Sequence, residues 1–255
     1  MATVQLFHTC LINEFAPQAG MSVVRVLERL GYTVEVPDAQ TCCGQPAFNA
    51  GFQDEARTAA RHTIAVLEAT DGPIVLPSGS CGDMVIHQYL ALFHDDLHWR
   101  ERAAAVAARC EEFSSFVARH HAVAATAPID ATVAYHPSCH LLRGLGIDAE
   151  PKRLIAQVPG VTRVPLAAED ECCGFGGLFA IKHADISTRM LERKIAQVIA
   201  SGAQRLVSCD MGCLLHLAGG LHRRGIDITV QHLAELLDRG DGGRGDGGRG
   251  GLASL

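Results

Sequence analysis

The sequence predicts an α/β protein built from two pseudo-symmetric repeated halves, each a mainly parallel sheet with flanking helices. Strand-like and helix-like stretches alternate along the chain, which favours parallel sheets covered by helices. A Cys-Cys-Gly triplet occurs twice, at Cys42–Gly44 and at Cys172–Gly174. After each triplet come a small-residue turn, a helical run and a short apolar stretch, in the same order. A repeated order of elements indicates duplication and pseudo-two-fold symmetry.

The first half begins with a predicted strand at residues 4–7, followed by a helix at 17–30 whose apolar side chains recur on one face. Gly31 ends that helix. Further elements are expected as strands at 33–36 and 74–76 and as helices at 53–68 and 83–93. The second half repeats this order, with strands at 132–135, 161–164 and 205–207 and helices at 151–158, 184–200 and 214–223.

These elements divide the chain into four predicted parts. The two cysteine-rich halves cover residues 1–96 and 129–238, and an Ala-rich helical linker over residues 97–128 joins them. The remaining tail, residues 239–255, consists mostly of Gly, Arg and Asp. Such a composition buries little apolar surface, so the tail is expected to be disordered.

Composition narrows the class of protein. At 255 residues the chain is long enough for a real core, and its net charge of −6 disfavours a nucleic-acid partner. No apolar run approaches the roughly 20 residues of a membrane span, and no basic, then apolar, secretory leader is visible. We therefore expect a cytoplasmic protein, in which ten cysteines indicate metal or redox chemistry more than disulfides.

Eight of the ten cysteines fall into two sets of four. Each set consists of one Cys, a triplet pair and a final Cys, separated by 31 and 37 residues in the first half and by 32 and 39 in the second. Most of these thiols follow the carboxyl end of a predicted strand, where α/β sheets bind ligands. The candidate metal ligands are Cys10, Cys42, Cys43 and Cys81, and Cys139, Cys172, Cys173 and Cys213.

Four thiolates suit either an iron–sulfur cluster or tetrahedral zinc. Structural zinc sites usually use short Cys-x-x-Cys knuckles, whereas adjacent cysteines can serve different irons of one cluster. The pattern therefore favours iron–sulfur clusters, with zinc, a metal-free thiol–disulfide role and simple burial as alternatives. A full set in each half favours two sites over one site between the halves.

Other residues accompany these sets. Cys209 precedes Cys213 and is a further candidate for cofactor binding. It is either an extra ligand or a thiol that contacts the ligands without binding the metal. Cys110 has no repeat counterpart and is expected to be a packed structural thiol. His8, His136 and His140 flank Cys10 and Cys139, and they are candidates for a ligand, a hydrogen bond to cluster sulfur or a cap.

The repeated spacing resembles that of the cysteine-rich (CCG) domain family over residues 3–238, including the segments Pro77–Cys81 and Asp210–Leu214. The family includes the B subunit of heterodisulfide reductase and the iron–sulfur subunit of glycolate oxidase. The resemblance is closest to its lactate utilization branch. The glycolate oxidase type has ferredoxin-like cysteine runs that this chain lacks. The heterodisulfide reductase type ends each repeat with Cys-x-x-Cys, whereas Met84 stands at that position here.

The resemblance implies iron–sulfur clusters of the 4Fe–4S type, one per half, in an electron-transfer subunit that contributes to oxidation of L-lactate to pyruvate. The implied partners are a ferredoxin-like iron–sulfur subunit and a small protein, resembling lactate utilization proteins B and C. The chain would then be an oxidoreductase subunit that needs these partners for activity. Disulfide cleavage at the cluster, a glycolate oxidase-type role and a cluster-bearing sensor are the alternatives.

Overall fold

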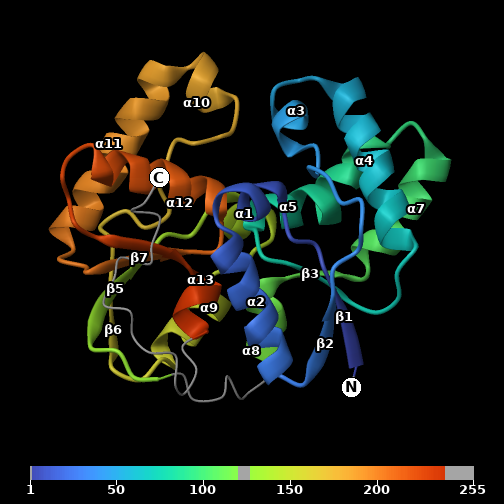
Figure 1. Cartoon of the computed structure of the whole chain (residues 1–255). Helices are drawn as coiled ribbons and strands as arrows, with labels where there is room; N and C mark the ends of the chain where they lie inside the picture. Colours follow the sequence, from blue (N-terminus) through green and yellow to red (C-terminus); the bar gives the residue numbers. More distant parts are fainter. Residues whose placement is uncertain (1, 120–126, 239–255) are drawn as a thin grey trace.

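The computed structural model describes residues 2–119 and 127–238, which form two four-stranded, fully parallel sheets (Figure 1). The strand orders β2-β1-β3-β4 and β6-β5-β7-β8 are the same in the two halves. The first sheet contains β1 (Ala2–Leu6), β2 (Tyr32–Glu35), β3 (Ile74–Leu76) and β4 (Cys110–Glu112). The second contains β5 (Ala131–Tyr135), β6 (Val161–Val164), β7 (Arg205–Ser208) and β8 (Thr229–His232). The predicted duplicated α/β fold is therefore confirmed.

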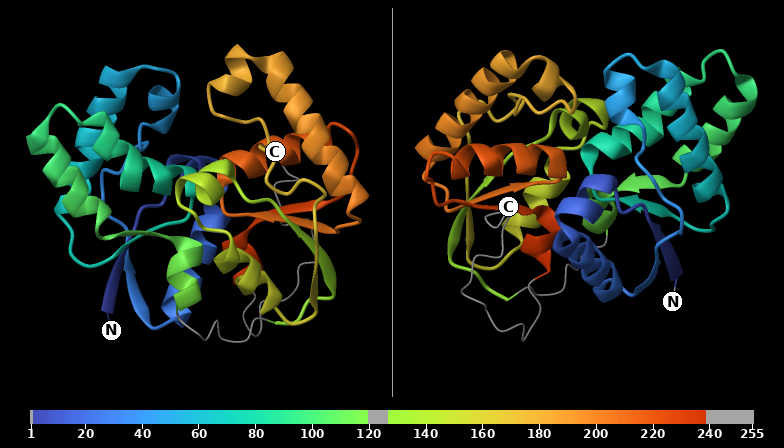
Figure 2. Two further views of the ribbon diagram at one scale, coloured as in Figure 1. Left: turned by 180° about the vertical axis from the view of Figure 1, so that it is seen from behind. Right: turned by 45° about the horizontal axis from the view of Figure 1, so that its top comes forward.

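A central layer of helices lies between the two sheets and joins the halves (Figures 1 and 2). It consists of α2 (Pro17–Arg29), α8 (Phe113–Arg119), α9 (Ala149–Ala156) and α13 (Leu233–Leu237). Buried side chains from these helices form one core with side chains from β1, β3, β5 and β7. Apolar burial is the main favourable term in folding, so this shared core binds the halves into one body.

The outer face of each sheet has a core of its own. The first is covered by α4 (Gln53–Glu68), α6 (Tyr89–Leu92) and α7 (Leu97–Ala107), and the second by α11 (Ala184–Ala200) and α12 (Met211–His222). Shorter elements lie at the carboxyl ends of the strands. They are α1 (Cys10–Phe15), α3 (Gln45–Asn49), α5 (Gly79–Asp83) and α10 (Phe179–Lys182), with π-helical turns η1 (Met84–Gln88) and η2 (His140–Gly144).

Some segments differ from the sequence-based expectation. The single helix expected at 83–93 starts earlier and passes through α5, η1 and α6. The segment expected as a helical linker holds α7, β4 and α8, and β4 pairs in parallel with β3. The fourth strand of each sheet, β4 and β8, was not predicted, because each is short and its pairing is long-range. Residues 120–126 of the linker and the tail 239–255 lie outside the described residues.

Within the described part of the chain, every helix is too short or too polar to cross a membrane.

Candidate metal centre

Each set of four cysteines, called a quartet below, gathers at the carboxyl end of its sheet. The first quartet is Cys10, Cys42, Cys43 and Cys81, and the second is Cys139, Cys172, Cys173 and Cys213. Open parallel sheets bind ligands at this end. Cys10 starts α1 just after β1, and Cys81 lies in α5 after β3. The triplet that begins at Cys42 follows β2. In the second half Cys139 follows β5, the second triplet follows β6, and Cys213 lies in the first turn of α12 after β7.

Both quartets line one cavity of about 160 Å³ between the halves. All eight candidate ligands border it, together with polar groups that include Thr9, Ser80 and His140. Its rim includes Gly176 and Gly177 from the second half opposite Pro46 from the first. The fold thus brings eight thiols from segments far apart in sequence to one place.

The first quartet is a chain of contacts between sulfurs. The Sγ atoms of Cys43 and Cys81 are 3.4 Å apart and both side chains are buried. Hydrogen bonds from Cys10 and Cys43 lower the pKa of the Cys42 thiol to about 3. The hydrogen bond with Cys42, followed by burial, raises the pKa of Cys10. A lowered pKa favours metal binding at Cys42, since the thiolate is the form that binds metal.

The second quartet repeats this geometry. The Sγ atoms of Cys173 and Cys213 are 3.2 Å apart. Hydrogen bonds from Cys139 and then Cys173 lower the pKa of Cys172 to about 2. Backbone N–H groups also point at the sulfurs, from Gly174 to Cys172 at 3.3 Å and from Phe175 to Cys173 at 3.5 Å.

The triplet glycines are required by the backbone. Gly44 and Gly174 have φ angles of +86° and +92°, a region that disfavours residues with a Cβ. A Cβ on Gly174 would also stand 2.7 Å from the carbonyl oxygen of Ser187 in α11. The left-handed turn lets two adjacent cysteines face the same quartet while α11 packs against the turn.

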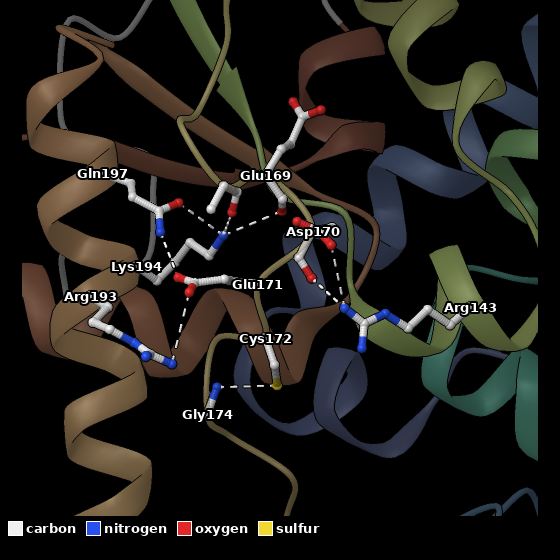
Figure 3. A network of polar contacts seen from close by, with 10 residues as sticks. Arg143, Glu169, Asp170, Glu171, Cys172, Gly174, Arg193, Lys194 and Gln197 are labelled. Atoms are coloured by element: carbon white, nitrogen blue, oxygen red, sulfur yellow. Dashed lines mark hydrogen bonds and ion pairs between the residues drawn. The ribbon is translucent and has the colours of Figure 1, made fainter.

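A buried lysine holds the loop that leads into the second triplet (Figure 3). Lys194 in α11 donates from Nζ to the carbonyl oxygens of Ala168, at 2.7 Å, and Glu169, at 3.3 Å. Arg143 secures the same loop through the carbonyl oxygen of Asp170 at 3.0 Å (Figure 3). Fixing the loop on both sides fixes the position of Cys172.

Two helix caps meet across the boundary between the halves. Ser78 caps α5 by accepting from the Cys81 N–H, and Asp210 caps α12 by accepting from the Cys213 N–H. Asp210 also accepts from the Ser78 hydroxyl at 3.1 Å and from the Ser80 N–H at 2.9 Å. The residues that orient Cys81 and Cys213 are therefore bonded to each other, so the two quartets are mechanically linked.

The three flanking histidines occupy different places. His140 lines the cavity, with Nδ1 3.6 Å from the sulfur of Cys139. His8 is half-buried, and its Nδ1 lies 3.4 Å from the Thr9 carbonyl oxygen. His136 is completely buried behind the second quartet, and one ring nitrogen and the sulfurs of Cys173 and Cys213 lie within 4.8 Å of one another.

The other two cysteines are not in the cavity wall. Cys209 is buried in the central core, where its sulfur accepts from the Tyr135 hydroxyl at 3.9 Å. In the repeat, Cys209 corresponds to Pro77 of the first half. Each comes two residues after a valine, Val207 or Val75, that pairs with β5 or β1 in its sheet. Burial raises the pKa of Cys110, in β4, to about 12. A role of Cys209 in cofactor binding stays a prediction. Its position in the central core favours packing behind the ligands over direct ligation.

The donor set fits an iron–sulfur cluster. Each quartet offers four converging thiols and backbone N–H groups that donate to sulfur, from Leu11 and Gly44 in the first half and from Gly174 and Phe175 in the second. Such hydrogen bonds tune iron–sulfur clusters. All ten cysteines are free thiols.

Sequence reasoning missed three polar residues that shape the site, namely Ser78, Asp210 and Lys194. The two caps had a usable signal, because a Ser or Asp three residues before a Cys can accept from that residue's N–H at a helix start. Lys194 carried no such signal, because its partners are carbonyl oxygens about 25 residues away.

Comparison with known proteins agrees with this geometry. The cysteine-rich domain model of the CCG family matches residues 4–86 and 133–218. The chain is 44% identical over 244 residues to lactate utilization protein A of an Exiguobacterium species, which covers 94% of this chain and 98% of the relative. It is 42% identical over 238 residues to lactate utilization protein A 1 of Bacillus anthracis, covering 93% of this chain and 98% of the relative.

Proposed function

Since the chain belongs to the cysteine-rich (CCG) domain family and aligns over nearly its full length with lactate utilization A proteins, we propose that it is the iron–sulfur electron-transfer subunit of an L-lactate-oxidising complex. Each quartet binds one 4Fe–4S cluster in this proposal. A bound cluster supplies one-electron oxidation and reduction. We also place the protein in the cytoplasm, where ten free thiols stay reduced.

The observation that carries the proposal is the meeting of two complete thiol quartets at one cavity. Oxidation of lactate to pyruvate releases two electrons and two protons. Two one-electron carriers side by side suit the passage of an electron pair. Direct contact between Ser78 and Asp210, which orient Cys81 and Cys213, keeps the two carriers at a fixed separation.

The cluster content is tested by anaerobic purification from iron-replete cells. We expect brown protein with iron and acid-labile sulfide in comparable amounts. Stoichiometric zinc without sulfide would overturn the cluster assignment.

The electron-transfer role is tested with an artificial dye as acceptor. We expect no lactate oxidation by the isolated chain, and activity once a ferredoxin-like iron–sulfur protein and a small partner resembling lactate utilization proteins B and C are added. Lactate oxidation by the isolated chain would contradict the proposed division of labour, because it would place the substrate site on this subunit.

The shared cavity favours one second candidate, reductive cleavage of a disulfide. A disulfide takes two electrons and two protons to give two thiols, and two adjacent one-electron carriers could supply those electrons. Under this alternative the isolated chain, given a reduced dye, releases free thiols from a small disulfide. Failure of that reaction, together with partner-dependent lactate oxidation, favours the first proposal.

A further inference from the structure

The two quartets have matching thiols but different surroundings, and the difference lies directly behind them. In the first half the Phe7 N–H donates to the Val75 carbonyl at 3.0 Å, and in the second the His136 N–H donates to the Val207 carbonyl at 2.8 Å. Phe7 and His136 are thus structural counterparts, each three residues before the first Cys of its quartet. Both are buried, with exposed fractions of 1% and 0%.

The imidazole of His136 has unused hydrogen-bonding capacity. Within the described part of the chain, neither Nδ1 nor Nε2 has a partner. A neutral imidazole has one N–H donor and one acceptor nitrogen, and leaving such groups unpaired in a core is unfavourable, because their hydrogen bonds to water are lost. The sulfurs of Cys173 and Cys213 both lie within 4.8 Å of a ring nitrogen.

We infer that His136 donates an N–H hydrogen bond to a cysteine sulfur of the second-half cluster, Cys173 or Cys213, and so makes the two clusters electronically unequal. The inference rests on the proposed iron–sulfur function. A donor role is favoured over direct ligation because the first quartet is complete with Phe7 at the same place, and because four thiols already serve each half.

The consequence is a difference in reduction potential. Hydrogen bonds to cluster sulfurs are one of the factors that set the potential of an iron–sulfur centre, because they stabilise the more negative, reduced state. Phe7 offers no such donor to the first quartet. The second-half cluster therefore has the higher potential through this contact, and electrons pass downhill from the first half to the second.

The test compares the full chain with two variants after reconstitution with iron and sulfide. His136→Phe copies the first half and removes the donor, whereas His136→Gln keeps a side-chain N–H. We expect full iron content in both. In a redox titration, one of the two reduction steps should shift to lower potential in His136→Phe and return towards the native value in His136→Gln.

The reciprocal variant Phe7→His provides a control in the other half. We expect it to raise the potential of the other reduction step, because it adds a donor behind the first quartet. Loss of about half the iron in His136→Phe would show that His136 is a ligand instead. Full iron content with unchanged reduction potentials in His136→Phe would overturn the inference, because it would show that the imidazole donates no hydrogen bond to the cluster. Absence of iron and sulfide in the native protein would instead overturn the proposed function.

A measurement on protein labelled with ¹⁵N-histidine avoids dependence on the folding of any His136 variant. The reduced second-half cluster should show weak ¹⁵N hyperfine coupling, of the size of a hydrogen bond and below that of an iron ligand. The coupling should persist in His140→Asn, which removes the histidine beside Cys139, and in His216→Asn, which removes the histidine that interacts with Cys172. Loss of the coupling in either variant, or its absence in the native chain, would overturn the inference.

Discussion

At the residue scale, the buried member of each triplet is the most sensitive probe of the metal centre. Replacing Cys43 or Cys173 by Ser removes a sulfur that lies 3.4 or 3.2 Å from its neighbour in the quartet. Each variant should lose about half of the bound iron, measured against protein concentration. Cys110→Ser is the matched control and should keep all of it, because Cys110 lies in β4 away from the cavity. Equal loss in all three variants would indicate general misfolding.

A second residue-scale prediction concerns the pH dependence of stability. Burial raises the pKa of Glu112 from the usual 4.5 to about 7, against hydrogen bonds from Ser114 and Ser115. Because the folded-state pKa is the higher one, the folded protein holds an extra proton between these two values. Stability from this group is therefore complete below pH 4.5 and lost as the pH rises to 7.

The variant Glu112→Gln should remove this dependence. The free energy of unfolding of the native chain, relative to the variant, should fall by roughly 3 kcal/mol between pH 4.5 and 7, at about 1.4 kcal/mol per pKa unit. Denaturant titrations at several pH values measure it. Parallel pH profiles for the two proteins would show that Glu112 does not titrate in this range.

At the scale of the elements, the turn of the second triplet and helix α11 depend on each other. Gly174→Ala places a Cβ 2.7 Å from the Ser187 carbonyl oxygen and strains a positive φ. We expect a lower melting temperature and loss of iron from the second quartet. Gly219→Ala lies on the exposed face of α12, with no atom within 4 Å of its new Cβ. This variant should instead raise the free energy of unfolding by up to about 1 kcal/mol, because Ala favours a helix over Gly. Full iron retention in Gly174→Ala would show that the turn can relax.

At the scale of the whole molecule, both halves contribute to the cavity, and Asp210 joins them at its wall. Asp210→Ala removes the cap of α12 and leaves the Ser80 N–H and the Ser78 hydroxyl without their acceptor. We expect a loss of about 1–3 kcal/mol in stability and lower iron content at both quartets, seen in both cluster signals.

The contact between Asp238 and two arginines of α2 gives the control for that prediction. Asp238 bonds Arg25 at 2.6 Å and Arg29 at 3.1 Å, so it too joins the halves, but it lies outside the cavity wall. Asp238→Ala should lower stability slightly and leave iron content unchanged. Iron loss in only the second quartet of Asp210→Ala would show that the halves hold their clusters independently.

The sequence by itself determined the duplicated α/β fold and the grouping of the cysteines. Helices α4 and α11 and strands β3 and β6 match their predicted bounds, because their apolar periodicity and flanking glycines are local signals. The strand-end rule also placed each quartet at the carboxyl edge of its own sheet, because parallel strands bring their carboxyl ends together.

Tertiary structure alone decided how the halves meet. The short edge strands β4 and β8, the shared cavity and the bond between Ser78 and Asp210 all depend on residues far apart in the sequence. It also separated Cys209 from the cavity and distinguished His136 from His8 and His140, which look alike in sequence. Periodicity reports which face of an element is buried. Which atoms then lie next to a buried group is settled only when distant elements pack together.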